Sequence, residues 1–205
     1  MAVSLHEQED AGKLLSGLLK EEEELQFTQF TNDDALILGS DLVANAKKEY
    51  PGQGIAILIT RNAQILFQHA MKGTTFFTAC SVPALEFPQL ANEYVKPPPP
   101  KKSNIGTTVD SENWLRRKNN TVVRLQHSSN YIGRSLASKG LKEMEQSYRV
   151  SMTDFACHGG GFPLLIKNVG CVGAIVVSGL KQDQDHALVV KSIRGMIQRH
   201  SSSSL

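Results

Sequence analysis

The hydrophobic positions of this chain recur with two periods, one typical of helices and one typical of strands. Residues 4–24 carry leucines at helical spacing, behind a serine and a glutamate that fit a capping box. Residues 31–46 repeat the helical period, with Thr31 or Asn32 as the cap and Tyr50-Pro51-Gly52 as the end. Between them, Leu25 to Phe30 alternates loosely as a strand would. These patterns predict two helices joined by a short strand.

Two pairs of apolar, β-rich segments follow the spacing of hairpins. Residues 54–60 and 64–71 flank Arg61-Asn62, where asparagine tolerates a positive φ. Residues 163–167 and 171–178 flank a turn at 168–170, and a helix is predicted from about Asp183 to Gln198. Antiparallel hairpins flanked by helices predict an α/β fold, a three-layer α/β/α sandwich with a mainly antiparallel sheet.

Residues 113–139 read mostly as helix. The candidate inward positions are Trp114, Leu115, Val122, Leu125, Ile132 and Leu136. We expect one domain over residues 1–199, followed by a polar, disordered tail at 200–205. That domain is interrupted by a Pro-rich excursion at 76–105, and Gly-Thr-Thr occurs on both sides of it, at 73–75 and 106–108. We hypothesise an in-frame insertion or a retained intron there.

Composition supports a globular protein and excludes several classes. The chain has 205 residues, 40% hydrophobic and 20% charged, which suits one core. A net charge of +2 with well-mixed signs argues against nucleic acid as a partner. No apolar run is long enough to span a bilayer, and the start has no signal-peptide core, so we expect no membrane contact and a cytoplasmic location. The three cysteines have neither disulfide nor zinc spacing.

The sharpest local motif is His158-Gly159-Gly160-Gly161-Phe162-Pro163, followed by a glycine turn and a strand ending in Val-Ser-Gly. The pattern resembles the GlcG/HbpS-like family, also called the haem-degrading domain. Upstream, Trp114-Leu115-Arg116-Arg117-Lys118 and His127-Ser128-Ser129 resemble its cytosolic subgroup found in fungi and bacteria.

The resemblance implies a profilin-like or PAS-like domain whose dimers build larger rings. Haem is the cofactor that it makes possible, although no axial-ligand motif maps onto this sequence. A fungal relative is linked to a chaperone route for tail-anchored proteins, which suggests cytosolic chaperone contacts. The tail Ser201 to Leu205 has no acidic residue of the kind that engages such chaperones.

The residue types of the glycine motif allow two interpretations. Three glycines permit positive φ and close backbone approach, and Pro163 fixes the entry into a strand. This geometry suits a ligand pocket as well as a tight structural corner, and the two can coexist. The candidate ligand-binding residues are Trp114, Arg117, Lys118, His158, Gly159, Gly160, Gly161 and Pro163.

The charged residues near this motif also allow more than one interpretation. Arg116, Arg117 and Lys118 fan around a helix and cannot all face one ligand, so a salt bridge or interface is weighed above ligand contact. Amides after Ser178 suit an anion, but Asp183 and Asp185 favour ordinary helix capping.

The histidines show no metal-binding spacing, so no metal is predicted. His158 with Cys157 and His186 with Asp185 would form a haem or metal site only if the terminal hairpin and helix packed closely. A structural histidine is the alternative.

Three functions remain open. The first is an oligomeric module that binds a small ligand, haem or a small anion. The second is a non-catalytic interaction protein with chaperone partners, and the third is a haem-degrading enzyme. No nucleophile elbow, P-loop or zincin motif is present, so the sequence assigns no catalytic residue.

Overall fold

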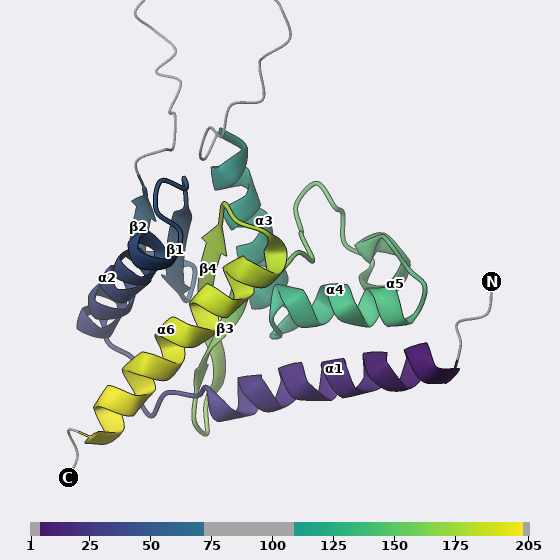
Figure 1. Ribbon diagram of the computed structural model, residues 1–205, viewed down its shortest axis with the longest axis horizontal. Helices are drawn as coiled ribbons and strands as arrows, with labels where there is room; N and C mark the ends of the chain where they lie inside the picture. Colours follow the sequence, from purple (N-terminus) through teal and green to yellow (C-terminus); the bar gives the residue numbers. More distant parts are fainter. Residues whose placement is uncertain (1–4, 72–108, 203–205) are drawn as a thin grey trace, which may run out of the picture.

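The structure is a computed structural model and describes residues 5–71 and 109–202 (Figure 1). Its helices are α1 (Leu5–Glu24), α2 (Asn32–Glu49), α3 (Val109–Leu125), α4 (Ser129–Ser138), α5 (Met144–Tyr148) and α6 (Gln182–Ser202). Its strands are β1 (Ala56–Arg61), β2 (Gln64–Ala70), β3 (Gly161–Ile166) and β4 (Gly170–Ser178). The strands form one antiparallel sheet in the order β2-β1-β4-β3. The predicted α/β class and the two hairpins are confirmed.

The centre of the sheet joins the two hairpins. β1 and β4 pair directly, with Ile57 opposite Val177 and Ile59 opposite Ile175. The first hairpin turns at Asn62 and Ala63, which have φ values of 49° and 64°. Two successive positive φ values are typical of a type I′ turn, whose twist matches the strands it joins.

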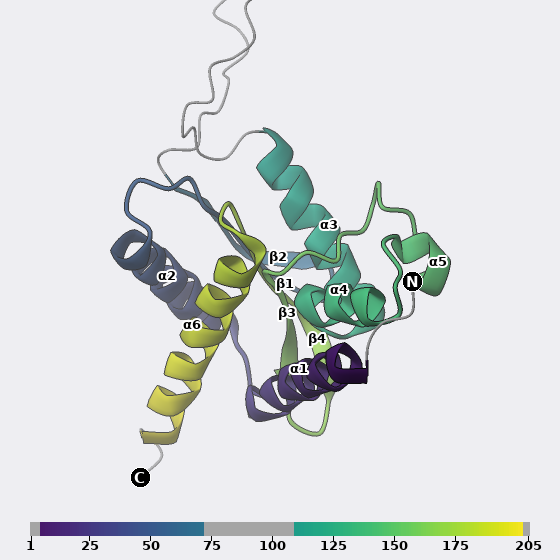
Figure 2. The same ribbon diagram turned by 45° about the vertical axis from the view of Figure 1, so that its right-hand side comes forward.

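Alternation along β1 divides the core between the two faces of the sheet. Ile57 and Ile59 pack in the main apolar cluster with residues of α2 and α6, whereas Ala56 and Leu58 pack in a second cluster with Leu115 of α3. Strand side chains alternate between faces, so both faces of this central strand need a helical cover. Figure 2 shows α2 and α6 on one side of the sheet and α3 with α4 on the other.

Helix α1 lies along α4 and is attached near its C-terminal end by two neighbouring glutamates (Figure 1). Glu22 is buried, accepts a hydrogen bond from the Ser128 N–H at 2.7 Å, and pairs with Nδ1 of His127 at 2.7 Å. Glu21 pairs with Nε2 of His186 at 2.9 Å. The acidic end of α1 is therefore held by groups of α6 and of the segment that caps α4.

Two sequence expectations about element boundaries are wrong. Leu25 to Phe30 is not a strand, because only Phe27 meets the sheet edge, in a single parallel bridge to Ile166. The helix expected at 113–139 is two helices, separated where Gln126 adopts a φ of 60° and Ser128 caps α4.

The C-terminal helix is longer than predicted. α6 continues to Ser202 and thus enters the segment that was expected to be disordered from residue 200. The Pro-rich excursion at 76–105 lies outside the described residues, so the insertion hypothesis stays a prediction. In the two described ranges, no helix is long and apolar enough to cross a membrane.

Candidate functional site

The glycine triplet lets three elements meet closer than any side chain would allow. Gly160 has a φ of +113°, and a Cβ built there would lie 2.4 Å from the Val177 carbonyl oxygen and 2.8 Å from Nζ of Lys118. At Gly161 a Cβ would lie 2.9 Å from Cγ2 of Val122, and at Gly159 it would lie 2.3 Å from the Gln182 carbonyl oxygen. Such distances exclude a Cβ unless the neighbouring atoms shift. The triplet therefore sets the distance of α3 and α6 from the sheet.

Lys118 of α3 and Asp185 of α6 form a buried ion pair behind Gly160. The Lys118 Nζ donates to Oδ2 of Asp185 at 2.9 Å and to the Val177 carbonyl oxygen at 2.9 Å. Burial lowers the pKa of Lys118 and raises the pKa of Asp185, and in each case the charge of the partner opposes the shift. The pair joins α3, β4 and α6 at one point.

Asp185 also caps the start of α6. Its Oδ1 accepts a hydrogen bond from the Leu180 N–H at 3.1 Å. The carboxylate thus occupies the position beside the α6 N-terminus that an anion would otherwise use. This arrangement supports the capping interpretation for Asp185, whereas Asp183 pairs with Arg134 at 2.7 Å.

Arg117 connects α3 to the loop before the glycine motif. Its guanidinium lies 4.5 Å from the ring centroid of Trp114, and it donates to the carbonyl oxygens of Phe155 and Met152. Arg116 is exposed and pairs instead with Asp154 at 3.0 Å. The three consecutive cations thus have three different partners, as expected for residues that fan around a helix.

His158 lies at the surface beside Trp114. The two rings meet edge to face with centroids 4.9 Å apart. Partial desolvation, followed by the positive charges of Lys118 and Arg117, lowers the pKa of His158. Its carbonyl oxygen accepts from Oγ of Ser129 at 2.5 Å, and that hydroxyl also accepts from the Gly161 N–H.

The predicted site residues therefore separate into two groups. Trp114, Arg117 and His158 come together near the surface, half-buried or exposed. Lys118 and Gly159 to Gly161 are buried behind them, and Pro163 is buried within β3 opposite Ala174. The motif brings residues of α3 and β3 together.

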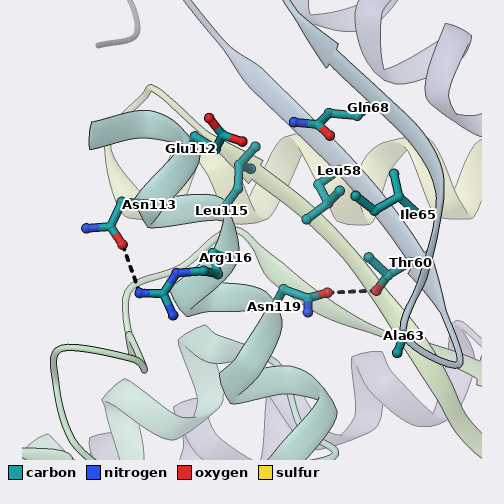
Figure 3. Close-up of a pocket in the computed structure, with 10 residues that line it drawn as sticks. All are labelled: Leu58, Thr60, Ala63, Ile65, Gln68, Glu112, Asn113, Leu115, Arg116 and Asn119. Carbon is teal, nitrogen blue, oxygen red and sulfur yellow. Dashed lines mark hydrogen bonds between the residues drawn. The ribbon is translucent and has the colours of Figure 1, made fainter. Parts of the chain in front are cut away.

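A cavity of about 550 Å³ lies on the opposite side of α3, between this helix and strands β1 and β2 (Figure 3). Sequence analysis did not identify it. Its lining residues are Leu58, Thr60, Ala63, Ile65, Gln68, Glu112, Asn113, Leu115, Arg116 and Asn119. The spacing of Glu112, Leu115 and Asn119 predicts that they share one face of the helix. Only the tertiary structure shows that this face lies against β2 and lines a cavity.

The cavity has an apolar middle and polar ends. Leu58, Ile65 and Leu115 lie at its centre, as Figure 3 shows. At one end, Oγ1 of Thr60 donates to Oδ1 of Asn119 at 2.7 Å. At the other end, Gln68 of β2 and Glu112 of α3 line the cavity, and Figure 3 shows their polar groups directed toward each other. Such a surface suits an elongated amphiphilic molecule.

Metal-binding groups do not gather in the described residues. In residues 5–71 and 109–202, no group of three or more His, Cys, Asp or Glu side chains is placed to hold a metal ion. The convergence considered for His158 and His186 does not form a shared site, because His158 packs on Trp114 while His186 pairs with Glu21. Both histidines contact protein groups instead.

Comparison with known proteins gives consistent results. A family model described as "Haem degrading protein HbpS-like" matches residues 101–194. A UPF0303 protein of Psychromonas ingrahamii is 33% identical over 184 residues, covering 90% of this chain and 93% of that protein. A UPF0303 protein of Streptomyces coelicolor is 35% identical over 181 residues, covering 88% and 91%.

Solved structures share the fold. The crystal structure of Ybr137w protein superposes with a TM-score of 0.70 at 25% identity, covering 91% of this chain and 88% of that one. A double mutant of HbpS from Streptomyces reticuli superposes with a TM-score of 0.52 at 17% identity, covering 82% and 88%. The sequence matches show that the chain belongs to the UPF0303 family, and its residues 101–194 match the HbpS-like family model.

Proposed function

We propose that this protein binds a small organic ligand in the cavity between α3 and strands β1 and β2. The observation that carries the proposal is the cavity itself, about 550 Å³ with an apolar middle and hydrogen-bonding groups at its ends. Cavities of this size and lining are typical of ligand sites. The proposal concerns binding and assigns no catalytic step.

The glycine motif supports this proposal as a positioning device. Lys118 and Arg117 fasten one side of α3 to Asp185 and to the Met152–Phe155 loop. The other side of the same helix contributes Leu115 and Asn119 to the cavity. A ligand site needs walls that keep their positions, and these contacts hold α3 in place.

Haem does not fit this cavity. Its described lining contains no imidazole, thiolate, thioether or phenol to serve as an axial ligand of iron. The nearest predicted candidate, His158, packs on Trp114 beside the other side of α3. We therefore propose a small amphiphile rather than haem as the ligand of the cavity.

Filling the cavity provides the direct test. Ile65 lines it and is 61% exposed, so Ile65→Trp should occupy the space without disturbing the buried core. Val169→Trp is the matched control, because Val169 is 69% exposed in the β3–β4 turn and does not line the cavity. Amphiphilic fragments should shift amide resonances of Leu58 and Asn119 in the parent and in Val169→Trp, but not in Ile65→Trp. Fragments that leave these resonances unmoved in the parent protein would refute the proposal.

For the surface formed by Trp114, Arg117 and His158, we propose contact with a small anion. The guanidinium of Arg117, half-buried against Trp114 and 4.5 Å from its ring centroid, supplies a positive charge that would favour a negative ligand there. Binding of phosphate or acetate should raise the pKa of His158, as measured by NMR titration. An unchanged pKa at saturating anion would contradict this second site.

We also propose that copies assemble in the cytoplasm as a homo-oligomer, a dimer or a ring of dimers. Two observations support assembly: Leu36 and Ile37 of α2 are exposed, and in the described ranges no strand pairs with the outer edge of β2. Chaperone contact through the tail remains a prediction from the family resemblance. A pull-down with and without residues 201–205 tests it, and equal recovery of a chaperone would exclude the tail as the contact.

A further inference from the structure

Two charged side chains, Arg116 and Glu112, line the cavity between α3 and strands β1 and β2, and they differ in their partners. Arg116 lines it, but the guanidinium donates to Oδ1 of Asp154, Oδ1 of Asn113 and the Thr153 carbonyl oxygen. Figure 3 shows this side chain directed toward Asn113 and away from the strands. The cation at the rim is thus already neutralised by protein groups.

Glu112 at the same rim has no such partner among the described residues. In residues 5–71 and 109–202, no ammonium, guanidinium or imidazole group is paired with its carboxylate. The side chain facing it across the opening is the neutral amide of Gln68 (Figure 3). Counting the described residues alone, the uncompensated charge at this end of the cavity is therefore negative.

The other end of the cavity is neutral and hydrogen-bonding. Thr60 donates its hydroxyl proton to Oδ1 of Asn119, which leaves the Asn119 amide N–H groups and the Thr60 oxygen lone pairs for a ligand. Thr60 lies two residues along β1 from Leu58, the partner of Gln68, so the strand separates the two ends by roughly 7 Å. On α3, Glu112 and Asn119 are seven residues apart, or roughly 10 Å.

We propose that the cavity selects an amphiphilic cation, a molecule with a protonated amine at one end and a hydrogen-bonding group at the other. The amine lies at the Gln68 and Glu112 end, the apolar chain contacts Leu58, Ile65 and Leu115, and the neutral group meets Thr60 and Asn119. This inference rests on the proposed function, because it requires that the cavity binds a ligand. The proposed ligand is positively charged, whereas a haem-like dicarboxylate is negatively charged.

Three probes of equal length separate the two proposals: 6-aminohexan-1-ol, hexane-1,6-diol and 6-hydroxyhexanoate. Each carries one hydroxyl for the Thr60 and Asn119 end, and they differ only in the charge of the opposite group. Titrations followed by the amide resonances of Leu58, Ile65 and Asn119 report binding at the cavity. The amine should bind about three- to tenfold more tightly than the carboxylate, with the diol between them, because the pairing is solvent-exposed.

Two variants assign the preference to one carboxylate. Glu112→Gln should bring the affinities of the amine and the carboxylate to about the same value while leaving that of the diol unchanged. Asp110→Asn is the matched control, because Asp110 is also an acid in the first turn of α3 but does not line the cavity. In Asp110→Asn, the ratio of the amine affinity to the carboxylate affinity should stay close to that of the parent protein.

The outcomes are distinct. If all three probes, including the diol, leave the resonances unmoved, both proposals fail. If the diol binds but the amine shows no advantage over the carboxylate, the cavity is a ligand site without the charge selection inferred here. An equal loss of selectivity in Asp110→Asn would also overturn the inference, because the preference would then come from the combined negative charge of the acids in this turn and not from Glu112 in the cavity.

Discussion

Nζ of Lys118 lies 2.9 Å from Oδ2 of Asp185, and both side chains are only 3% exposed. The two residues are 67 positions apart and belong to α3 and α6, which lie on opposite faces of the sheet. The pair is satisfied on both sides, because Lys118 also donates to the Val177 carbonyl oxygen and Asp185 also accepts from the Leu180 N–H. Removing one partner leaves a buried charge alone, which costs far more than the net value of the pair.

Lys118→Met is expected to lower the free energy of unfolding by about 3–5 kcal/mol at neutral pH. Without the cation, only the backbone hydrogen bonds to Asp185 oppose the effect of burial, so its folded-state pKa rises further above the unfolded value. The loss should therefore diminish as the pH falls toward that raised pKa, where the lone carboxyl takes up a proton. Urea unfolding at several pH values measures both effects.

The matched control for that substitution is Arg116→Met. Arg116 forms an ion pair with Asp154, but the two side chains are 50% and 55% exposed. Its removal should cost no more than about 1 kcal/mol, with little dependence on pH. If Lys118→Met lowers the free energy of unfolding no more than Arg116→Met does, the buried ion pair contributes little to stability.

Gly160→Ala is expected to lower the free energy of unfolding by about 2–4 kcal/mol, because the new Cβ meets backbone at a positive φ. Gly17→Ala is the opposite case, since nothing lies within 4 Å of a Cβ at this exposed position of α1. It should raise the free energy of unfolding by about 0.5–1 kcal/mol. Denaturant unfolding compares the two, and a neutral Gly160→Ala would disprove the close approach.

His127 is expected to stabilise the protein more in acid than in base. The hydrogen bond to Glu22 is the main cause that raises the pKa of His127 above its ordinary 6.5. Because the folded state holds this proton more tightly, the contribution is fully present below about pH 6.5 and is lost as the pH rises through the raised pKa. Unfolding measured against pH, compared with His127→Gln, gives this dependence.

His158 should behave with the opposite sign. Its pKa is lowered, so its contribution to stability is present above its ordinary value of 6.5 and is lost as the pH falls through the lowered pKa. NMR titration of the two imidazoles should therefore show His127 titrating above pH 6.5 and His158 below it. Titration of both at the same pH would contradict the environments described for them.

Native mass spectrometry before and after haem addition should show an oligomer whose mass does not change. The expectation follows from the cavity lining, which has no axial ligand for iron among its described residues. A haem-bound mass that disappears in His158→Ala would instead place haem at the Trp114 surface. A monomer at micromolar concentration would contradict the proposed assembly.

Local pattern was sufficient to predict most of the elements. The continuous apolar segment in 54–60 reflects the two covered faces of β1, and Thr31, one of the two predicted caps, caps α2. The same reasoning failed at Leu25 to Phe30, which contacts the sheet edge only through a bridge at Phe27. A short apolar segment has the same sequence pattern whether it forms a full strand or a single bridge. The glycine motif indicated close backbone approach, and its three positions have that property.

The sequence by itself determined the α/β class, the two hairpins, the family and the buried positions Leu115, Val122, Ile132 and Leu136, because these depend on local period and on a contiguous motif. Trp114 was also expected to face inward, but it lies near the surface. Only the tertiary structure decided which partners distant groups meet. It joined Lys118 to Asp185 and Thr60 to Asn119, and it placed Glu112 and Asn119 opposite β2. Periodicity shows which side of an element faces inward, but the packing of the whole core determines what that side contacts.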